Sequence, residues 1–306
     1  MPISRRDFTK AGFAAAALSG TGLPSLSLAG NDLIKRAIPS SGESIPIVGV
    51  GTNRYGVGND AELRQPLRDA LAKFHELGGT VIDTAPGYRS SEMVLGDLID
   101  ELGIREDLFM ATKIDQETRG DNEARFEQSI QSLEFSTIDL LQCHNLIGWE
   151  TAIPQMKEWK EEGRIRYVGI TTSRDNQYEL MERIIKSHEL DFIQINYSLA
   201  DQRESAERLL PLAQSRGMAV LVNRPFGGGN VFAKLAKAKL PAWAADIDCS
   251  SWGQFLLKYA LSHPAVTCAI PGMTKTRHVE DNLMAAVGRM PNAEQRRAQE
   301  AFFDAL

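Results

Sequence analysis

An acid, a phenol, an amine and an imidazole stand at or just after the ends of three consecutive apolar runs of the sequence. Asp83 ends the first of these runs, and Tyr88 follows it by five residues in the same predicted loop. Lys113 and His144 come directly after the next two runs. If the runs are neighbouring strands of a parallel barrel, their carboxyl ends lie on one face and bring the four side chains together.

This set of side chains suits the delivery of a proton to a carbonyl oxygen. A phenol has an ordinary pKa of about 10, so Tyr88 needs a neighbouring ammonium group to stabilise its anion. Lys113 can supply that charge, and the carboxylate of Asp83 would keep the lysine protonated. His144 would then donate a hydrogen bond that polarises the carbonyl group.

Each of these residues also has a structural interpretation when it is taken alone. Asp83 fits a helix cap, Tyr88 a loop aromatic, Lys113 a solvated strand end and His144 a hydrogen-bonded core histidine. A metal-dependent hydrolase that uses Asp83 and His144 is a weaker alternative, because no second histidine stands at a predicted strand end. The joint occurrence of all four favours the proton-delivery site, and we predict no metal.

The elements that must position these residues follow an alternating pattern. Eight short, nearly continuous apolar runs alternate with segments of helical periodicity, which is typical of parallel strands buried on both faces. Eight such pairs predict a (β/α)8 TIM barrel, and the lack of a G-x-G-x-x-G motif after the first run disfavours a Rossmann domain. The predicted strands are 47–51, 80–83, 108–112, 138–143, 165–170, 192–196, 219–222 and 266–270.

Two further elements flank the predicted barrel. Residues 37–47 read as a small N-terminal hairpin that would close the bottom of the barrel. The last segment reads as a terminal helix that begins at or near Asn292. We therefore expect an α/β chain with one barrel domain.

Several motifs together resemble the aldo-keto reductase family, and in order they cover residues 37–290. These motifs are "GGTVIDTAPGYRSSEMVLG", "FMATK", "DLLQCHN", "GRIRYVGI" and "IPGMTKTRHVEDN". The resemblance implies a barrel that binds a nicotinamide cofactor, usually NADPH, without a Rossmann motif. It also implies that Tyr88 is the general acid, that Lys113 and Asp83 tune it, and that His144 orients the carbonyl while hydride comes from the cofactor.

The resemblance also places cofactor contacts on the other side of the barrel mouth. Gln194 matches the residue that holds the carboxamide, and Asn223 stands where the family usually has an aromatic residue that stacks on the nicotinamide. Lys275 and Arg277 would pair with a 2′-phosphate, which favours NADP over NAD. The predicted cofactor-binding residues are Thr171, Thr172, Gln194, Asn223, Pro225, Phe226, Gly227, Gly228, Lys275, Arg277, Asp281 and Asn282.

The substrate side is less specific in the sequence. Tyr55 and Trp149, together with Phe226, lie in loops that could form an apolar wall, although surface packing explains them equally well. Arg89 follows the predicted catalytic tyrosine, where the family commonly has glycine, and it could shape the rim of the pocket or contact an acidic substrate. The expected substrate is a small carbonyl compound.

Composition and charge exclude some classes of partner. The formal net charge of −6 and the pI of about 5.5 provide no basic field for nucleic acid. The three cysteines, Cys143, Cys249 and Cys268, are far apart in sequence and show no C-x-x-C pair, so we expect them to be core residues.

The first residues differ from the rest of the chain. "SRRDFTK" precedes an uncharged segment that ends in small residues, and the pair Arg5 and Arg6 resembles a twin-arginine (Tat) export signal. Glycine, serine and proline make the apolar segment too weak for a stable membrane anchor. We predict a signal peptide at 1–29, a barrel at 30–306, recognition by the Tat machinery, and a periplasmic or otherwise exported location.

Two functions remain compatible with these observations. The first is an exported NADPH-dependent reductase of aldehydes or ketones. The second is a nicotinamide-binding sensor or regulatory protein on the same barrel with little or no turnover, because Asn223 removes the usual stacking contact and free NADPH is scarce outside the cytoplasm.

Overall fold

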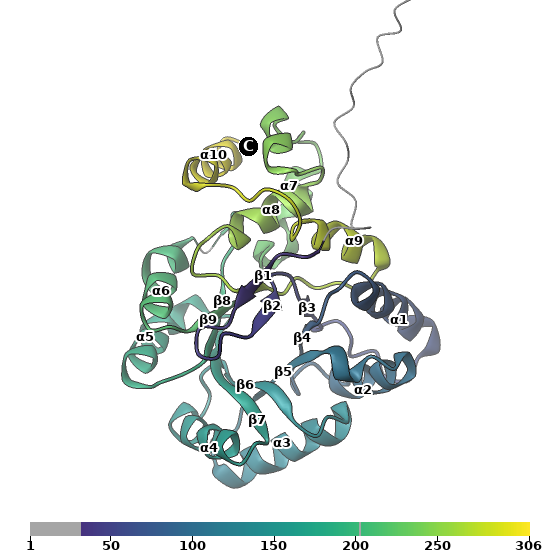
Figure 1. The fold of residues 1–306 in the computed structure, drawn as a ribbon, viewed down its shortest axis with the longest axis vertical. Coiled ribbons are helices and arrows are strands. Elements are labelled where there is room, and N and C mark those ends of the chain that lie inside the picture. Colours follow the sequence, from purple (N-terminus) through teal and green to yellow (C-terminus); the bar gives the residue numbers. More distant parts are fainter. Residues whose placement is uncertain (1–31, 202) are drawn as a thin grey trace, which may run out of the picture.

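The computed structural model describes residues 32–201 and 203–306, which form a barrel of parallel strands surrounded by helices (Figure 1). Hydrogen-bonded neighbours follow one another in chain order from β3 to β10, and bridges from Val48 to Ala269 and from Gly51 to Gly272 close the ring. The barrel strands are β3 (Val50–Gly51), β4 (Val81–Asp83), β5 (Phe109–Ile114), β6 (Ile138–His144), β7 (Ile165–Thr171), β8 (Phe192–Asn196), β9 (Ala219–Asn223) and β10 (Cys268–Ala269). The predicted barrel is confirmed.

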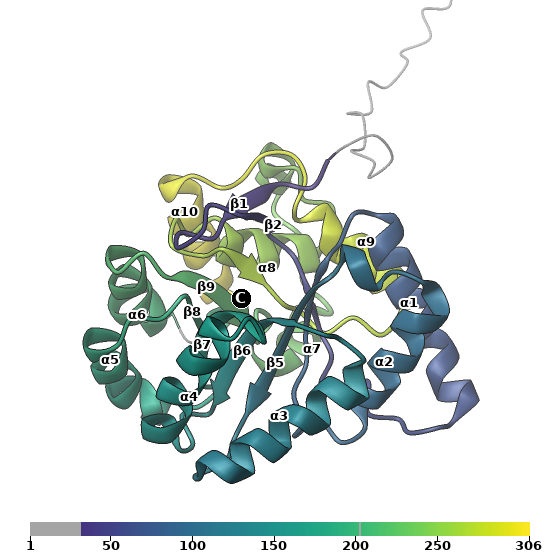
Figure 2. The ribbon, with the colours of Figure 1, turned by 60° about the horizontal axis from the view of Figure 1, so that its bottom comes forward.

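Helices cover the outside of the barrel and join successive strands (Figures 1 and 2). They are α1 (Ala61–Glu76), α2 (Ser91–Leu102), α3 (Arg119–Leu133), α4 (Trp149–Glu161), α5 (Tyr178–Ser187), α6 (Glu204–Ser215), α7 (Val231–Leu235), α8 (Trp252–Leu261), α9 (Thr276–Met284) and α10 (Ala293–Asp304). The predicted terminal helix is confirmed, because Asn292 caps α10 in a capping box with Gln295. Two helices, α7 and α10, exceed the expected one per strand.

The N-terminal hairpin lies across one end of the barrel (Figure 1). It pairs β1 (Lys35–Ala37) with β2 (Ser44–Pro46) and so begins two residues before the predicted segment. Ile38 and Ile45 are buried in the same cluster as Phe109 and Phe192 at the starts of β5 and β8. The hairpin therefore seals the amino ends of the strands with apolar side chains.

Alternation along each strand decides which side chains enter the barrel. Phe109 and Ala111 of β5 belong to the cluster inside the barrel, and Lys113 is the next residue on the same face. The same spacing of two carries β6 from Leu140 inside the barrel to His144 at its end. Apolar residues thus fill the sealed end, and polar residues gather at the carboxyl ends of the strands.

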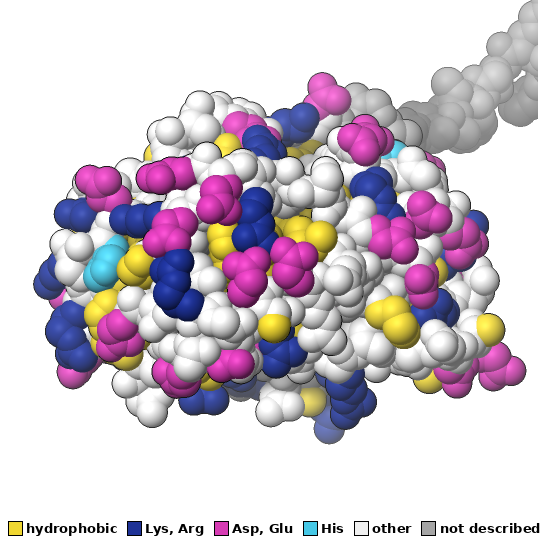
Figure 3. Space-filling view, turned by 90° about the horizontal axis from the view of Figure 1, so that it is seen from below, with side chains coloured by type: hydrophobic (Ala, Val, Ile, Leu, Met, Phe, Trp, Pro, Cys, Tyr) yellow, Lys and Arg dark blue, Asp and Glu magenta, His cyan; other side chains and the backbone are white. Residues whose placement is uncertain are grey.

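The outer surface mixes both signs of charge. On the face shown in Figure 3, lysine and arginine side chains alternate with aspartate and glutamate, and apolar side chains lie between them in small groups. Among the described helices, none combines the length and apolarity that crossing a bilayer requires. The prediction for Cys143, Cys249 and Cys268 is confirmed, since all three are buried and unpaired.

A buried lysine of α8 holds together the connection before α8 and the connection after α9. The Nζ of Lys258 donates to the backbone oxygens of Ile247 at 2.9 Å, Val287 at 2.8 Å and Arg289 at 2.9 Å. The side chain is fully buried, and this burial lowers its pKa. Lys258 therefore supplies the hydrogen-bond donors for these three carbonyl groups.

We predict that Lys258→Met destabilises the protein. Methionine fills the space but leaves three carbonyl oxygens without a donor, which should cost roughly 2–3 kcal/mol of unfolding free energy and lower the melting temperature by roughly 5 °C. Thermal unfolding followed by circular dichroism measures the change, with Lys237→Met at an exposed lysine as the control. Equal melting temperatures for both variants and the wild type would show that Lys258 is not a brace.

Candidate active site

A cleft of about 720 Å³ opens at the carboxyl ends of the strands. Loops that follow β3, β7, β9 and β10 line it, together with eight of the predicted residues: Asp83, Tyr88, His144, Gln194, Asn223, Pro225, Phe226 and Gly228. A larger hollow of about 1040 Å³ lies at the opposite end, between the ends of α4 and α6, and contains none of the predicted site residues. The chemistry therefore belongs to the smaller cleft.

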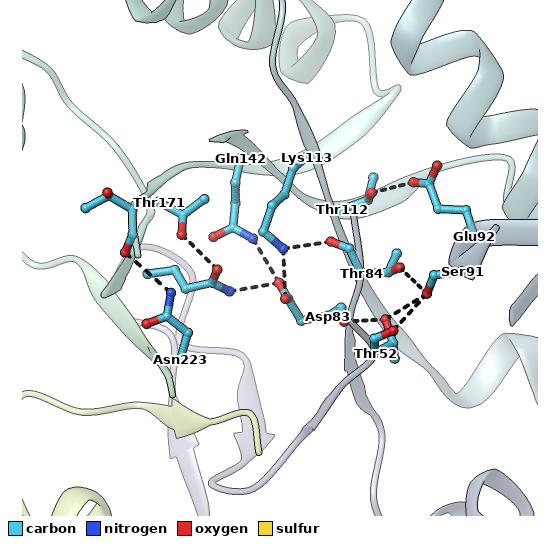
Figure 4. A network of polar contacts seen from close by, with 12 residues as sticks. Thr52, Asp83, Thr84, Ser91, Glu92, Thr112, Lys113, Gln142, Thr171 and Asn223 are labelled. Carbon is cyan, nitrogen blue, oxygen red and sulfur yellow. Dashed lines mark hydrogen bonds and ion pairs between the residues drawn. The ribbon is translucent and has the colours of Figure 1, made fainter. Parts of the chain in front are cut away.

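An ion pair forms the floor of this cleft. The Nζ of Lys113 lies 2.8 Å from Oδ2 of Asp83 and donates to the backbone oxygen of Thr84 at 2.7 Å (Figure 4). Lys113 and Asp83 are only 1% and 2% exposed. Burial alone would lower the pKa of Lys113, but attraction to Asp83 and Tyr88 outweighs it and leaves that pKa above its ordinary value. The ammonium group therefore keeps its proton although it is buried.

The second oxygen of Asp83 is held by two amide groups. Oδ1 accepts hydrogen bonds from Nε2 of Gln142 at 3.1 Å and from Nε2 of Gln194 at 2.8 Å. Oε1 of Gln194 accepts in turn from the hydroxyl of Thr171 at 2.8 Å. Gly169 lies opposite Gln142 on β7, where an added Cβ would stand only 3.1 Å from the Gln142 side chain. The carboxylate is thus fixed in position by donors from three strands, β5, β6 and β8.

A second buried carboxylate lies behind β5, on the side that faces the helices (Figure 4). Glu92 of α2 accepts hydrogen bonds from the hydroxyl of Thr112 at 2.6 Å and from the hydroxyl of Ser129 at 3.1 Å. Burial raises the pKa of Glu92, while these hydroxyls and the charge of Lys113 favour its ionised form. The wall of the site is therefore polar on both faces of β5.

Tyr88 and His144 lie above the ion pair, with their rings perpendicular and the ring centroids 6.2 Å apart. The Nζ of Lys113 lies 5.5 Å from the centroid of the tyrosine ring. We expected this ammonium group to make the phenol more acidic, and the net effect is the opposite. Lys113 lowers the pKa of Tyr88, but burial and the charge of Asp83 together raise it above its ordinary value. The hydroxyl is therefore protonated at neutral pH.

His144 is a neutral imidazole at neutral pH. Burial first, and then the positive charges of Lys113 and Arg174, lower its pKa to about 4. A neutral ring offers one N–H donor and one acceptor nitrogen. The cleft thus presents a phenol hydroxyl and an imidazole side by side, both able to donate a hydrogen bond to one oxygen atom.

On the other side of the cleft, Asn223 presents an unused acceptor. Its Nδ2 donates weakly to the backbone oxygen of Thr172 at 3.4 Å, whereas its Oδ1 is buried without any partner among the described residues. A buried amide oxygen without a donor is unfavourable, so it suits a ligand that brings an N–H group. Thr171 and Thr172 are both buried beside it at the end of β7.

The glycine-rich loop after β9 follows a backbone path that favours glycine. Gly227, Gly228 and Gly229 have φ angles of 55°, 76° and 94°. A Cβ on Gly228 would also lie 2.7 Å from the guanidinium of Arg224. Simple flexibility therefore does not explain the three glycines. Pro225 and Phe226 precede them, and this loop forms one wall of the cleft.

The predicted residues on α9 fall into two groups. Lys275 and Arg277 are exposed at the first turn, and neither has a carboxylate within 4.0 Å in the part of the chain that the structure describes. Asp281 instead accepts hydrogen bonds from Ser251 and Gln254 of the α8 region, each at 2.8 Å. Asp281 therefore ties α9 to the start of α8, and Asn282 is buried beside it in the sequence.

The three predicted substrate residues differ in placement. Tyr55 is 1% exposed, and its hydroxyl donates to the backbone oxygen of Met273 at 2.9 Å, so its prediction as a wall of the pocket is wrong. Trp149 lies in the first turn of α4 and does not line the cleft. Arg89 is exposed next to Tyr88 with a positive φ of 57°, and it is not among the residues that line the cleft, so its role at the rim stays a prediction.

Sequence reasoning missed three polar residues of the site. Gln142 was visible as the single amide of its strand, two residues before His144. Arg54 and Arg224 line the cleft from the loops after β3 and β9, and their only signal was their position after a strand. Loops have no regular residue periodicity, so the sequence does not show which of their side chains point into the cleft.

Comparison with known proteins gives a consistent result. The Aldo/keto reductase family matches residues 47–301. Methylglyoxal reductase YeaE of Escherichia coli (strain K12) is 28% identical over 268 residues, which cover 85% of this chain and 92% of that protein. L-galactose dehydrogenase of Arabidopsis thaliana is 28% identical over 289 residues, with coverage of 82% and 87%.

The fold is shared with solved aldo-keto reductases. The structure from Klebsiella pneumoniae in complex with NADPH superposes with a TM-score of 0.73 at 24% identity, over 89% of this chain and 96% of that one. The matched range contains Asp83, Tyr88, Lys113 and His144. This chain belongs to the aldo/keto reductase family.

Proposed function

We propose that this protein is an NADPH-dependent reductase that converts aldehydes or ketones to alcohols, with Tyr88 as the proton donor. The observation that carries the proposal is the protonated phenol of Tyr88 in the cleft above the buried pair of Lys113 and Asp83. His144, a neutral donor beside it, would bind the same carbonyl oxygen.

The cleft suits a nicotinamide dinucleotide. The unpartnered Oδ1 of Asn223 and the free second N–H of Gln194 would receive the carboxamide, and Arg224 with the glycine-rich loop would receive the pyrophosphate. Lys275 and Arg277 would bind a 2′-phosphate, in agreement with the solved relative that holds NADPH. The bound cofactor supplies hydride, and the protein orients it.

The chain's own residues then handle the proton. The Tyr88 hydroxyl gives its proton to the carbonyl oxygen as negative charge develops there, while His144 stabilises that charge by hydrogen bonding. Lys113 stabilises the phenolate that remains. Asp83, held by Gln142 and Gln194, keeps the ammonium group aligned.

Small carbonyl compounds are the proposed substrates, because one relative is named a methylglyoxal reductase. A specific observation also favours the second candidate, a nicotinamide-binding sensor. Asn223 cannot stack on a nicotinamide ring as an aromatic residue would.

We predict that Tyr88→Phe lowers kcat for carbonyl reduction by at least ~100-fold, because phenylalanine keeps the ring and removes the proton donor. NADPH binding, measured by quenching of tryptophan fluorescence, should stay within about twofold, since the hydroxyl is not assigned to the cofactor. Tyr167→Phe, a tyrosine at the sealed end of the barrel, is the control.

Unchanged turnover in Tyr88→Phe would rule out Tyr88 as the proton donor. NADPH binding by the wild type without turnover of any carbonyl compound would favour the sensor. Failure to bind any nicotinamide would remove both candidates.

The pH dependence of reduction follows from the two shifted groups. The pKa of Tyr88 is raised, so the donor form is fully present at neutral pH and is lost only as the pH rises above about 10. His144 titrates near pH 4 and stays neutral above that range. We predict that kcat/KM for a neutral aldehyde is flat between about pH 6 and 9. A change of kcat/KM with pH near 6.5 in steady-state assays would contradict the neutral, buried state of His144.

We also propose that residues 1–29 are a Tat signal and that residues 30–306 form the exported barrel. The signal residues lie outside the described part of the chain, and the support is the pair Arg5 and Arg6 with the uncharged segment after it. Since Tat transport carries folded proteins, the barrel could take its cofactor with it.

We predict that the double variant Arg5→Lys, Arg6→Lys keeps the protein in the cytoplasm of a bacterium with a Tat pathway. Cell fractionation and immunoblotting measure the distribution, and Lys10→Gln, which keeps both arginines, is the control. Equal export of the double variant and the wild type would contradict the proposal.

A further inference from the structure

Many arginines on the outer faces of the barrel pair with carboxylates, although Arg183, Arg216 and Arg297 have no such partner among the described residues, and those around the cleft have none either. Outer arginines such as Arg64, Arg164 and Arg203 have carboxylate oxygens at 2.8, 2.7 and 2.7 Å. Arg54, which lines the cleft, has no carboxylate within 4.0 Å among the described residues. The same holds for Arg89 next to Tyr88, within the described part of the chain.

A third arginine without a carboxylate partner among the described residues lies next to the cleft, in the loop after β7. Arg174 follows directly after Ser173, which lines the cleft, and its positive charge contributes to the lowered pKa of His144. It is exposed, and within residues 32–201 and 203–306 no carboxylate lies within 4.0 Å of its guanidinium. Arg54, Arg89 and Arg174 therefore lie around Tyr88 and His144.

Packing brings Arg54 and Arg89 to the same side of the tyrosine. The loop after β3 passes so close to the Tyr88 loop that a Cβ on Gly56 would lie 2.3 Å from the backbone oxygen of Tyr88 and 2.9 Å from Cβ of Arg89. The two arginine backbones are thus held beside the proposed proton donor by direct contact between their loops.

The acidic residues nearby do not neutralise these arginines. Asp83 is the one acid that lines the cleft among the described residues, and Lys113 already pairs with it. Asp115, whose charge also acts on His144, pairs with Arg125 at 3.4 Å. The mouth of the cleft therefore carries uncompensated positive charge on the side of the phenol.

We propose that the substrate is an aldehyde or ketone that carries a carboxylate, bound with its carbonyl group at Tyr88 and His144 and its carboxylate among Arg54, Arg89 and Arg174. This inference rests on the proposed reductase function and names its substrate class. Guanidinium groups bind carboxylates through paired N–H donors, so they select an acid over a neutral molecule of the same shape.

The phosphates of the cofactor could bind these arginines in place of a substrate carboxylate. Arg224 lies against the glycine-rich loop, and Lys275 and Arg277 lie on α9, so these three cations are assigned to the phosphates. Arg54, Arg89 and Arg174 lie in the loops after β3, β4 and β7, and they remain for the substrate. An experiment must separate the two sources by measuring KM for NADPH and for the carbonyl compound independently.

The test compares acids with their methyl esters on the full mature protein with NADPH. Succinic semialdehyde and 4-carboxybenzaldehyde are each paired with the methyl ester, which keeps the shape and removes the charge. We expect kcat/KM to be ~10-fold or more higher for each acid, as for a hydrogen bond to a charged group, and this preference should shrink at high salt. In Arg54→Gln and Arg174→Gln the ratio of acid to ester should fall by ~10-fold, whereas Arg183→Gln, an exposed arginine on α5, should keep it.

Two outcomes would overturn the inference, and a third would count against the reductase function on which it rests. Equal kcat/KM for acid and ester in the wild type would show that the mouth does not select a carboxylate, although the reductase function would stand. A rise in KM for NADPH in Arg54→Gln and Arg174→Gln, with the acid preference intact, would assign these arginines to the cofactor. No turnover of either acid or ester would instead count against the reductase function itself.

Discussion

The site depends on the salt bridge between Lys113 and Asp83, whose side chains are almost completely buried. Removing two charges from water is costly, and the cost is recovered only if every remaining donor and acceptor finds a partner. Here two glutamine amides and one backbone carbonyl complete the arrangement. Because those partners come from separate strands, the correct register of the barrel is needed before the pair can form, and the tyrosine above it depends on both.

Single strands of the barrel supply both core residues and residues of the candidate site. In β5 the residues Phe109, Ala111 and Lys113 lie on one face, so the same alternation that fills the core delivers the ammonium group two residues later. The hairpin closes the opposite end with Ile38 and Ile45. Apolar packing is thereby concentrated at the amino ends of the strands. The loops at the carboxyl ends determine which ligands can bind.

Sequence patterns predicted most of this arrangement. Apolar runs gave the strands to within a few residues, and the strand ends gave Asp83, Tyr88 and His144, because the chemistry of a barrel lies at the carboxyl ends of its strands. Tyr55 was misplaced, since a loop aromatic can turn into the core as easily as toward the cleft. The raised pKa of Tyr88 was also beyond the sequence, because it is a balance among burial and two opposite charges whose distances only the fold defines.

The three thiols described with the fold have a consequence for handling and for the cell. They are buried apart from one another, and burial raises the pKa of each, to about 12 for Cys249. Thiolate, the form that reacts with oxidants, is therefore suppressed at all three. The native state relies on no covalent cross-link, so it is indifferent to redox potential, and a reducing or an oxidising compartment would leave it equally intact.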